Sequence, residues 1–559
     1  MKIAVVGTSN SIRVEGYFPL YQAIEYPNIV DNLSLGGSNC QLIPYSIEKY
    51  KIFDNYDFLI TDTAINDGDY LAPRHRSADW LYNELYSVMS IIKEAPMRHL
   101  HLVFPYDIEY KEHYKIHCQV CQELDIPYLD IEKILSASSQ YGIKDLYTDI
   151  RHISYFLSKQ LAFVIKEERK RIFSAPKSED MSACYKHKKY ILYSLPDKFK
   201  GKYPVCTKSS SLLSYDYIVL KDNDTLFLDN LPKLNLESIS FWSNTRAGYY
   251  TLETENHKQN FNLFYTETHF THFRPLPKEA FPVNKFLKLR LGLDPKYPAP
   301  LSEYTFAPNY TENNELILNS FLFSKTVSPP LKWKEKNLPD NSEQYISIFH
   351  KICSFCMAVP KYANATALKY IPADYVFIAA HAYPENRILR KEFLTLLKKS
   401  DNPYFAYGYA KLYLLPRKKY AAATKILEHA LEQRTIINAV IDLTHCYIRL
   451  KKFDEALNSI RFITEEKHHI KRLSLLCSIY ANMGLPDLFF KKAQEMLALN
   501  EKFSTVLEIA DNCIIMKKYQ EAWDLLQTIF EDPRSFIYEG QRNSIMQKIK
   551  EVQTYLKNT

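Results

Sequence analysis

Residues 2–11 read KIAVVGTSNS, an apolar run followed by a glycine, a threonine and a serine. The small and β-branched residues of Lys2–Val6 predict a short buried strand. A glycine gives room for a tight turn, so Ser9 would stand at the carboxyl end of that strand, with a helix beginning behind it. Taken alone, the pattern equally fits a serine that caps a helix. Other segments of the chain decide between these interpretations.

Four further short apolar runs follow, separated by amphipathic stretches: Ile29–Leu35, Asp57–Thr61, Leu100–Phe104 and Pro127–Leu129. Alternating strands and helices predict a parallel sheet covered on both faces. Such sheets bind ligands outside the carboxyl ends of their strands. We therefore expect residues 1–172 to form an α/β/α domain of the flavodoxin-like kind, with its active edge beside Ser9.

The middle of the chain, residues 173–335, predicts a β-rich module. Helical periodicity fades there, and short aromatic or β-branched runs such as Thr225–Leu228 and Ser238–Trp242 are separated by turn residues. Each of these runs predicts a separate strand. The aromatic residues make the module a candidate for carbohydrate binding, although most of them are expected to be ordinary core or surface residues.

The last part, residues 336–559, predicts a helical repeat domain. Four stretches align at a period of 33 residues: Leu414–Tyr420, Tyr447–Phe453, Tyr480–Pro486 and Cys513–Tyr519. Each follows one amphipathic helix and begins another, which resembles tetratricopeptide-type hairpins stacked as a solenoid. Lysine pairs recur at one register position: Lys418-Lys419, Lys451-Lys452 and Lys517-Lys518. Either they form a row that attracts an anionic polymer, or they solvate the turns between helices.

Composition sets limits on the class of protein. The chain has 559 residues, a formal net charge of +7 and 10 cysteines. Such a mild positive charge suits a polyanionic partner or a phosphorylated cofactor, and we expect no nucleic-acid partner. No stretch reaches the apolar length of a membrane span, and no signal peptide precedes the first strand. We expect a cytoplasmic protein with reduced cysteines, with peripheral attachment to the inner face of the membrane as an alternative.

Two Cys-x-x-Cys pairs could together form a zinc site, Cys118/Cys121 and Cys353/Cys356. Each pair stands in a helix-like stretch rather than in a knuckle-like loop, so buried small side chains explain them better. We expect no metal and no tightly bound cofactor.

Three more polar segments fall where an α/β sheet presents its active edge. They are Asn32–Ser38, Thr63–Gly68 and Tyr147–His152. An acyl-transfer site needs a nucleophile, a base, an orienting carboxylate and donors for an oxyanion. Together with Ser9, these segments contain every one of those groups.

The order and spacing of these segments resemble the four sequence blocks of the SGNH (GDSL-type) hydrolase superfamily, over roughly residues 1–170. The resemblance implies that Ser9 is the nucleophile, His152 the base and Asp149 the residue that orients it. It also implies an oxyanion hole made by the Ser9 N–H, the Gly37 N–H and the Asn66 side-chain amide.

The resemblance has one departure, because Thr8 stands where the family usually has aspartate. Ser11 therefore remains an alternative nucleophile. Candidate substrate contacts are Arg74 and Arg76, for the phosphates of coenzyme A or an anionic glycan, and Trp242, for sugar stacking.

The same triad serves esterases and acetyltransferases, which differ in whether water or a sugar attacks the acyl-enzyme. The first block resembles bacterial polysaccharide O-acetyltransferases. We therefore expect transfer of an acetyl group from acetyl-coenzyme A to a hydroxyl of a capsular or surface polysaccharide. The helical repeats would recruit that polymer or capsule-assembly proteins. A carbohydrate esterase and a non-catalytic scaffold of a polysaccharide assembly complex are the alternatives.

Overall fold

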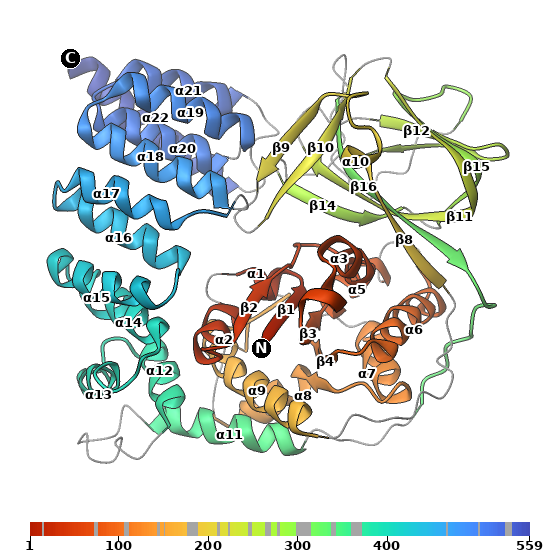
Figure 1. The fold of residues 1–559 in the computed structure, drawn as a ribbon, viewed down its shortest axis with the longest axis horizontal. Helices are drawn as coiled ribbons and strands as arrows, with labels where there is room; N and C mark the ends of the chain where they lie inside the picture. Colours follow the sequence, from red (N-terminus) through yellow and green to blue (C-terminus); the bar gives the residue numbers. More distant parts are fainter. Residues whose placement is uncertain are drawn as a thin grey trace.

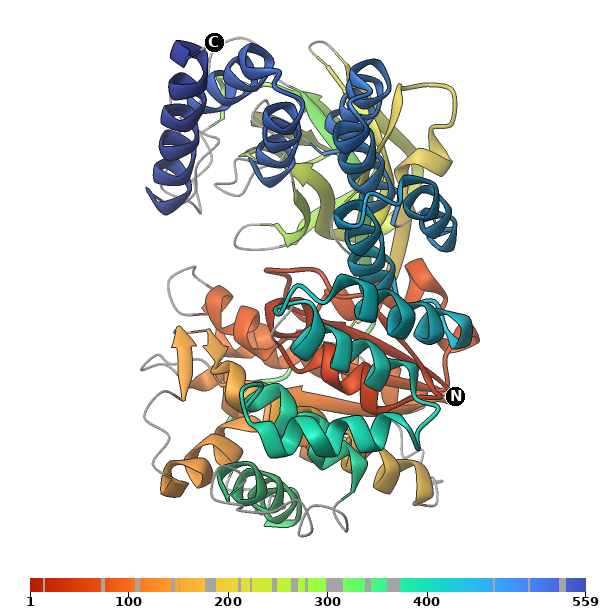
Figure 2. The same ribbon diagram turned by 90° about the vertical axis from the view of Figure 1, so that its left-hand side faces the viewer.

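The computed structural model has three regions: a small α/β domain, a large antiparallel sheet and a helical region (Figure 1). Figure 2 shows the helical region running from the level of the α/β domain to the level of the antiparallel sheet. The structure describes residues 1–13, 16–71, 76–105, 111–141, 146–149, 151–175, 188–209, 213–221, 224–243, 249–262, 270–276, 280–297, 315–336, 343–358, 372–465, 468–500, 503–531 and 539–558.

The α/β domain is built on a parallel sheet with the strand order β2-β1-β3-β4-β5. Its strands are β1 (Lys2–Gly7), β2 (Ile29–Asn32), β3 (Phe58–Asp62), β4 (Arg98–Val103) and β5 (Tyr128–Asp130). This is the flavodoxin-like order, and each strand corresponds to one that the sequence predicted. The order reverses at β1 and β3, so a crevice is expected at their carboxyl ends.

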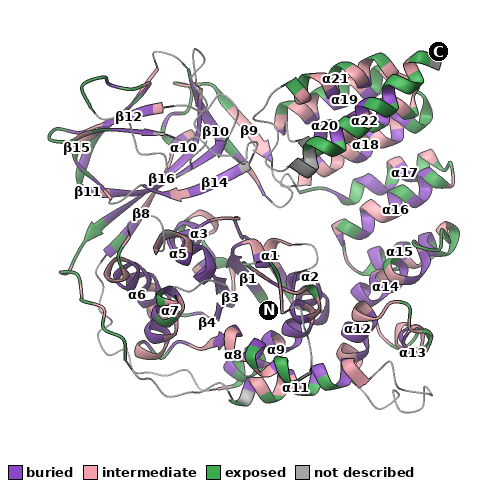
Figure 3. Cartoon of the chain, turned by 180° about the vertical axis from the view of Figure 1, so that it is seen from behind, coloured by how far each residue is buried: buried purple, intermediate pink, exposed green. Residues whose placement is uncertain are grey.

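Helices cover both faces of this sheet. They are α1 (Ser9–Ile12), α2 (Phe18–Ile24), α3 (Leu42–Tyr50), α4 (Ile52–Asn55), α5 (Ala64–Leu71), α6 (Ala78–Glu94), α7 (Glu112–Glu123), α8 (Ile131–Ser138) and α9 (Tyr155–Ser174). Alternate residues of β1 enter opposite cores: Ile3 and Val5 share a cluster with α2 and α9, whereas Ala4 and Val6 share one with α3 and α6. Both faces of the sheet are therefore buried (Figure 3).

The middle region is a nine-stranded sheet whose paired strands run antiparallel. Its strands are β8 (Lys188–Ser194), β9 (Val205–Ser209), β10 (Ser214–Leu220), β11 (Thr225–Ser243), β12 (Tyr249–Glu253), β13 (Lys258–Asn262), β14 (Phe270–Pro275), β15 (Phe281–Leu291) and β16 (Leu316–Thr326); the short helix α10 (Leu195–Lys198) follows β8. The prediction of two separate strands at Thr225–Leu228 and Ser238–Trp242 is wrong, because both belong to β11. Register shifts against β15 absorb the turn-like residues between them.

A buried polar network joins the sheet to the α/β domain. Lys188 of β8 forms ion pairs with Glu84 of α6 and with Glu237 of β11, 2.8 Å from the latter. Glu237 in turn accepts a hydrogen bond from Gln41, just before α3. Tyr45 of α3 adds a hydrogen bond of 3.2 Å to Asn319 of β16. The two regions are therefore held together by several independent contacts.

The helical region contains α11 (Glu343–Ala358), α12 (Ala373–Ala382), α13 (Arg387–Leu397), α14 (Pro403–Tyr409), α15 (Tyr420–Gln433), α16 (Ile437–Arg449), α17 (Phe453–Ser459), α18 (His469–Met483), α19 (Pro486–Leu499), α20 (Phe503–Ile515), α21 (Tyr519–Glu531) and α22 (Glu539–Asn558). Buried residues of α11–α17 share one hydrophobic cluster with α2 and α9 of the α/β domain. Helices α18–α22 form a second cluster, and α18 also contributes Leu475 and Ile479 to the first. Within the described residues, each helix is too short or too polar to cross a membrane.

One type of turn occurs four times between helices of this region. Lys418, Lys451, Gly484 and Lys517 all have positive φ, between 54° and 71°. Next to Lys451, the Lys452 N–H donates to the Tyr447 carbonyl at 2.9 Å, and the other three turns repeat this bond. Such a left-handed residue ends a helix and satisfies its last carbonyls. The 33-residue period thus marks a repeated turn, while stacking as a tetratricopeptide solenoid stays a prediction.

Candidate functional site

The predicted triad residues lie together at the carboxyl edge of the parallel sheet. Ser9 is the first residue of α1, directly after β1. His152 Nε2 is 2.7 Å from Ser9 Oγ, and His152 Nδ1 is 2.7 Å and 2.8 Å from the two carboxylate oxygens of Asp149. Because the carboxylate accepts the Nδ1 proton, Nε2 is free to accept the proton of the serine hydroxyl.

Asp149 and His152 stand on a small exposed hairpin formed by β6 (Tyr147–Asp149) and β7 (His152–Ile153). The side chain of Asp149 is 48% exposed and that of His152 17%. Burial opposes ionisation of Asp149, but hydrogen bonds from the Arg151 N–H and from His152 outweigh it, so the Asp149 pKa is lowered. Burial lowers the pKa of His152 despite the hydrogen bond with Asp149. The imidazole is therefore neutral, as a general base requires, near pH 7.

A buried carboxylate holds the loop that carries Ser9. Asp62, at the end of β3, is 2% exposed and accepts hydrogen bonds from the Thr8 N–H at 2.6 Å and the Thr8 hydroxyl at 3.2 Å. It also accepts from the hydroxyls of Ser11 and Tyr17. Ser11 is 1% exposed, so its hydroxyl faces the core, whereas that of Ser9 faces His152. Burial raises the pKa of Asp62 to about 6, against these hydrogen bonds.

The two predicted oxyanion donors other than Ser9 lie on different elements, Gly37 on a loop and Asn66 on a helix. Gly37 has a φ of 67° in the loop after β2. Asn66, on α5, is 3% exposed and donates its side-chain amide to the Ser38 carbonyl at 3.0 Å. Asp67, the next residue, accepts the Cys40 N–H at 3.0 Å. Residues 38–40 are thus fixed by two consecutive side chains of α5.

A chain of buried side chains continues inward from Asp67. Its carboxylate lies 3.1 Å from His117 Nε2, whose Nδ1 lies 2.8 Å from His101 Nε2. Thr61 then bridges His101 and His99, at 2.7 Å from each. If Asp67 accepts from His117, every bond in the chain takes a consistent direction, with each histidine neutral and protonated on Nε2. Burial lowers the pKa of His117 to about 3, and raises that of Asp67 to about 7.

The three predicted substrate contacts, Arg74, Arg76 and Trp242, have different outcomes in the structure. Arg74 lies outside the described residues. Arg76 donates to the Leu276 carbonyl after β14, and its guanidinium lies 4.5 Å from the centre of the Trp80 ring. Trp242 is 2% exposed and packs edge-on against Tyr217, so its ring belongs to the core. In this conformation, Arg76 and Trp242 serve contacts between elements.

The cysteine pairs stand on separate helices, α7 and α11. Cys121, Cys353 and Cys356 are buried, and burial raises the pKa of each thiol. In the described part of the chain, no three His, Cys, Asp or Glu side chains are arranged to hold a metal ion.

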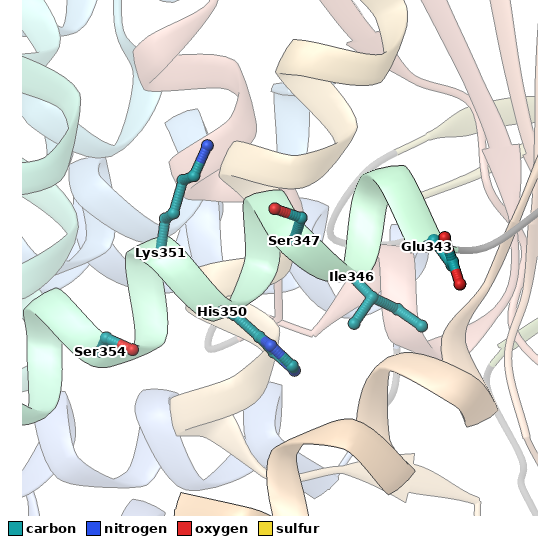
Figure 4. Close-up of a pocket in the computed structure, with 6 residues that line it drawn as sticks. All are labelled: Glu343, Ile346, Ser347, His350, Lys351 and Ser354. Atoms are coloured by element: carbon teal, nitrogen blue, oxygen red, sulfur yellow. The ribbon is translucent and has the colours of Figure 1, made fainter.

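Two hollows lie away from the triad. One, of about 590 Å³, runs along α11 past His350 and Lys351 (Figure 4). The other, of about 540 Å³, lies between α16, α18 and α20, with His445, Lys471 and Glu508 in its lining. Neither is lined by Ser9, His152 or Asp149, so neither marks the chemistry of the triad.

No protein-family model matches the chain, and no curated protein matches it. Among solved structures it is similar to a two-domain esterase active on acetylated mannans, with a TM-score of 0.43 and 12% identity over 59% of this chain and 92% of that one. It is also similar to a lipase/acylhydrolase from Enterococcus faecalis (TM-score 0.26, 17% identity, 32% of this chain and 98% of that one). An acetylxylan esterase from Geobacillus stearothermophilus gives a TM-score of 0.25 and 14% identity, over 32% of this chain and 96% of that one. Similarities at these TM-scores are too weak to support a function, which is therefore inferred from the geometry of the site itself.

Proposed function

We propose that the protein is a serine esterase that removes small acyl groups, acetyl above all, from carbohydrate hydroxyls. The observation that carries this proposal is the unbroken line of hydrogen bonds from Asp149 through His152 to Ser9. A neutral imidazole between a carboxylate and a serine hydroxyl is the arrangement that activates serine as a nucleophile.

The reaction has two halves. Ser9 Oγ attacks the acyl carbon while its proton passes to His152 Nε2; the tetrahedral intermediate then collapses as His152 returns that proton to the departing sugar oxygen. A water next gives a proton to His152 and attacks the acyl carbon of the acyl-Ser9 ester. As this second tetrahedral intermediate collapses, His152 returns the proton to Ser9 Oγ and the carboxylic acid leaves. The Ser9 N–H, the Gly37 N–H and the Asn66 amide are the donors proposed for the oxyanion in both halves.

Hydrolysis is favoured over transfer by the exposure of Asp149, the carboxylate that orients the base His152. Asp149 is nearly half exposed, at 48%. An acyltransferase must protect its acyl-enzyme from water, because water competes with the acceptor hydroxyl. A site open on the side of its base instead admits the water that hydrolysis needs. Transfer from acetyl-coenzyme A uses the same acyl-Ser9 intermediate, so one set of experiments can compare the two.

The test is Ser9-dependent turnover of p-nitrophenyl acetate, together with labelling by a fluorophosphonate probe. We expect Ser9→Ala to lose both activity and labelling, while Ser136→Ala, which removes an exposed serine of α8, keeps both. Full activity in folded Ser9→Ala would refute the role of Ser9, whereas a parent protein with neither turnover nor labelling would favour the scaffold alternative. Acetylated mannan and xylan, the substrates named for the similar esterases, are the first polymers to test for acetate release, with and without acetyl-coenzyme A.

A further inference from the structure

A strand of the antiparallel sheet reaches the loop that carries Gly37. Strand β14 lies on the side of that sheet nearest the α/β domain (Figure 1). One terminal nitrogen of the Arg274 guanidinium, Nη1, donates to the Gly37 carbonyl. The other, Nη2, is 3.3 Å from His272 Nδ1 on the same strand. His272 is fully buried and stacks on Phe241, so it offers the arginine a fixed point.

Gly37 is shaped to receive this guanidinium. A Cβ atom on residue 37 would lie 2.6 Å from Arg274 Nη2, closer than real Cβ atoms approach, and 3.1 Å from Cζ, so the guanidinium would have to shift. The residue's φ of 67° also favours glycine. The absence of a side chain at position 37 therefore does two things, allowing the left-handed turn and allowing the arginine to lie against it.

The loop is consequently held from two directions. On one side Asn66 binds the Ser38 carbonyl at 3.0 Å and Asp67 binds the Cys40 N–H at 3.0 Å, both from α5. On the other side Arg274 binds the Gly37 carbonyl, from a residue 237 positions away in the sequence. Of these three bonds, only the one from Arg274 comes from the antiparallel sheet, so the position of the Gly37 peptide depends on a separate module.

We propose that Arg274 is a positioning residue for the oxyanion hole, through which the antiparallel sheet completes the active site of the α/β domain. The proposal rests on the esterase function proposed above. Arg274 does not touch the reacting atoms. It fixes the carbonyl of Gly37, which shares a peptide plane with the Ser38 N–H, and through the Gly37 backbone it sets the orientation of the Gly37 N–H one peptide earlier. Its loss should therefore lower kcat rather than weaken the binding of a small ester.

Docking of the sheet does not depend on this arginine. Lys188 with its two glutamates, the Tyr45–Asn319 hydrogen bond and the Tyr45–Phe273 ring contact, with centroids 4.6 Å apart, all remain when Arg274 is replaced. Arg274→Ala is therefore expected to fold. Tyr45→Phe is a matched control, because it removes a hydrogen bond between the same two regions without altering the Gly37 loop.

The experiment measures kcat and KM for p-nitrophenyl acetate in the full chain. We expect Arg274→Ala to lower kcat about 100-fold, with KM changed by no more than about 2-fold, since small misplacements of catalytic groups have effects of that size. Guanidinium ion at millimolar concentration should restore part of the loss. The acid limb of the pH profile, which reports His152, should not move. Tyr45→Phe should keep kcat within about 2-fold of the parent.

Arg274→Lys covers the case in which the alanine variant does not fold. It keeps a donor and the charge, and should lie between the parent and Arg274→Ala in kcat. Parent-like kcat in folded Arg274→Ala, or an equal loss in Tyr45→Phe, would overturn the proposal while leaving the esterase function intact. If the parent protein itself has no Ser9-dependent turnover, the esterase function fails, and the role of Arg274 fails with it.

Discussion

Two left-handed glycines, Gly37 beside the triad and Gly484 between two helices, have nearly the same backbone conformation. Their φ angles are 67° and 71°. Their surroundings differ sharply. A Cβ on Gly37 would collide with Arg274, whereas a Cβ on Gly484 would meet nothing within 4 Å. The positive φ favours glycine at both positions. Of the two, only Gly37 has neighbouring atoms that would crowd a Cβ.

The helical region shows what the open turn permits. At the three positions equivalent to Gly484, separated by 33 residues, the chain has Lys418, Lys451 and Lys517, all with positive φ. A long side chain can stand there because it projects into free space, at a modest cost in backbone energy. The same substitution beside the triad would have to displace the Arg274 guanidinium.

The largest effect is therefore expected from Gly37→Ala. The added methyl group must displace Arg274 and strain the turn, which moves the Gly37 N–H, the donor that we propose for the oxyanion. We expect kcat for p-nitrophenyl acetate to fall about 100-fold to 1000-fold, the loss typical of one oxyanion donor. Steady-state kinetics on protein shown to be folded by circular dichroism measures it.

Gly484→Ala is the control for this variant, because it places the same methyl group on the same backbone conformation in open space. Its kcat should equal that of the parent. In an Arg274→Ala background Gly37→Ala should cost less than it does alone, since the clash is gone and the two changes share one contact. Additive effects of the two substitutions would show that the crowding at Gly37 is irrelevant to catalysis.

Asp62→Asn tests how much the buried hydrogen bonds of Asp62, which fix the loop of Ser9, contribute to the free energy of unfolding. Its buried carboxylate accepts from the Thr8 N–H and from the hydroxyls of Ser11 and Tyr17. An amide offers one acceptor oxygen to these donors, so we expect the free energy of unfolding to fall by about 2–3 kcal/mol. Urea denaturation measures this. Asp216→Asn, an exposed acceptor on β10, should change it by less than about 0.5 kcal/mol.

The same variant should remove a pH dependence. Burial raises the pKa of Asp62 to about 6, above the value near 3.9 of an unfolded chain. The folded state thus binds more protons between these values, and this group makes the protein less stable as pH rises from about 4 to about 6. The stability difference between parent and Asp62→Asn should change across that window and level off above it. A difference independent of pH would contradict the raised pKa.

The sequence could predict the parallel sheet because its strands follow short local patterns, and the residues that we propose as the triad also stand in short patterns at strand ends. Asp62 could have been predicted as well, since a carboxylate directly after a buried strand at an active edge is costly unless it is used. The role of Arg274 could not. Its place against Gly37 depends on how β14 docks on another region, and no local pattern carries that information.

Strand β11 and the buried histidines illustrate the same limit. Turn-like residues suggested two strands, because register shifts that absorb them depend on the partner strand β15. His99 and His101 stand two residues apart on β4, but Thr61, Asp67 and His117 belong to other elements, and only the fold joins all five in one hydrogen-bonded chain. Tertiary contacts, rather than local preferences, determine both features.

A smaller effect is expected on the pH dependence of kcat/KM, which reports the ionisation of His152 on the β6–β7 hairpin. Burial lowers the pKa of His152, with a further contribution from the positive charge of Arg13, which lies 3.8 Å from Asp149. Since the base must be neutral, kcat/KM should fall with decreasing pH only below His's ordinary pKa of about 6.5. Arg13→Ala should move this acid limb to higher pH. A parent limb at or above about 6.5 would show that burial does not control the imidazole.

The smallest effect is expected at the helix turns. Lys451 has a φ of 57°, so Lys451→Gly should relieve backbone strain and raise the free energy of unfolding by about 0.5–1 kcal/mol, while Gly484→Lys should lower it by a similar amount. Thermal or urea unfolding of the full chain measures both.

Lys452→Gly tests whether charge or backbone explains the lysine pairs. Lys452 has the same charge one position later, but its φ is −96°, an ordinary value for any residue. Glycine there gains nothing in the folded state and adds freedom to the unfolded chain, so stability should fall by about 0.5–1 kcal/mol. Opposite signs of the change in unfolding free energy at these two neighbouring lysines would show that Lys451 acts through the backbone conformation of the turn. Equal effects, together with a salt-sensitive rise in KM for a long anionic polymer when both are replaced, would instead favour a row of positive charge that holds the substrate.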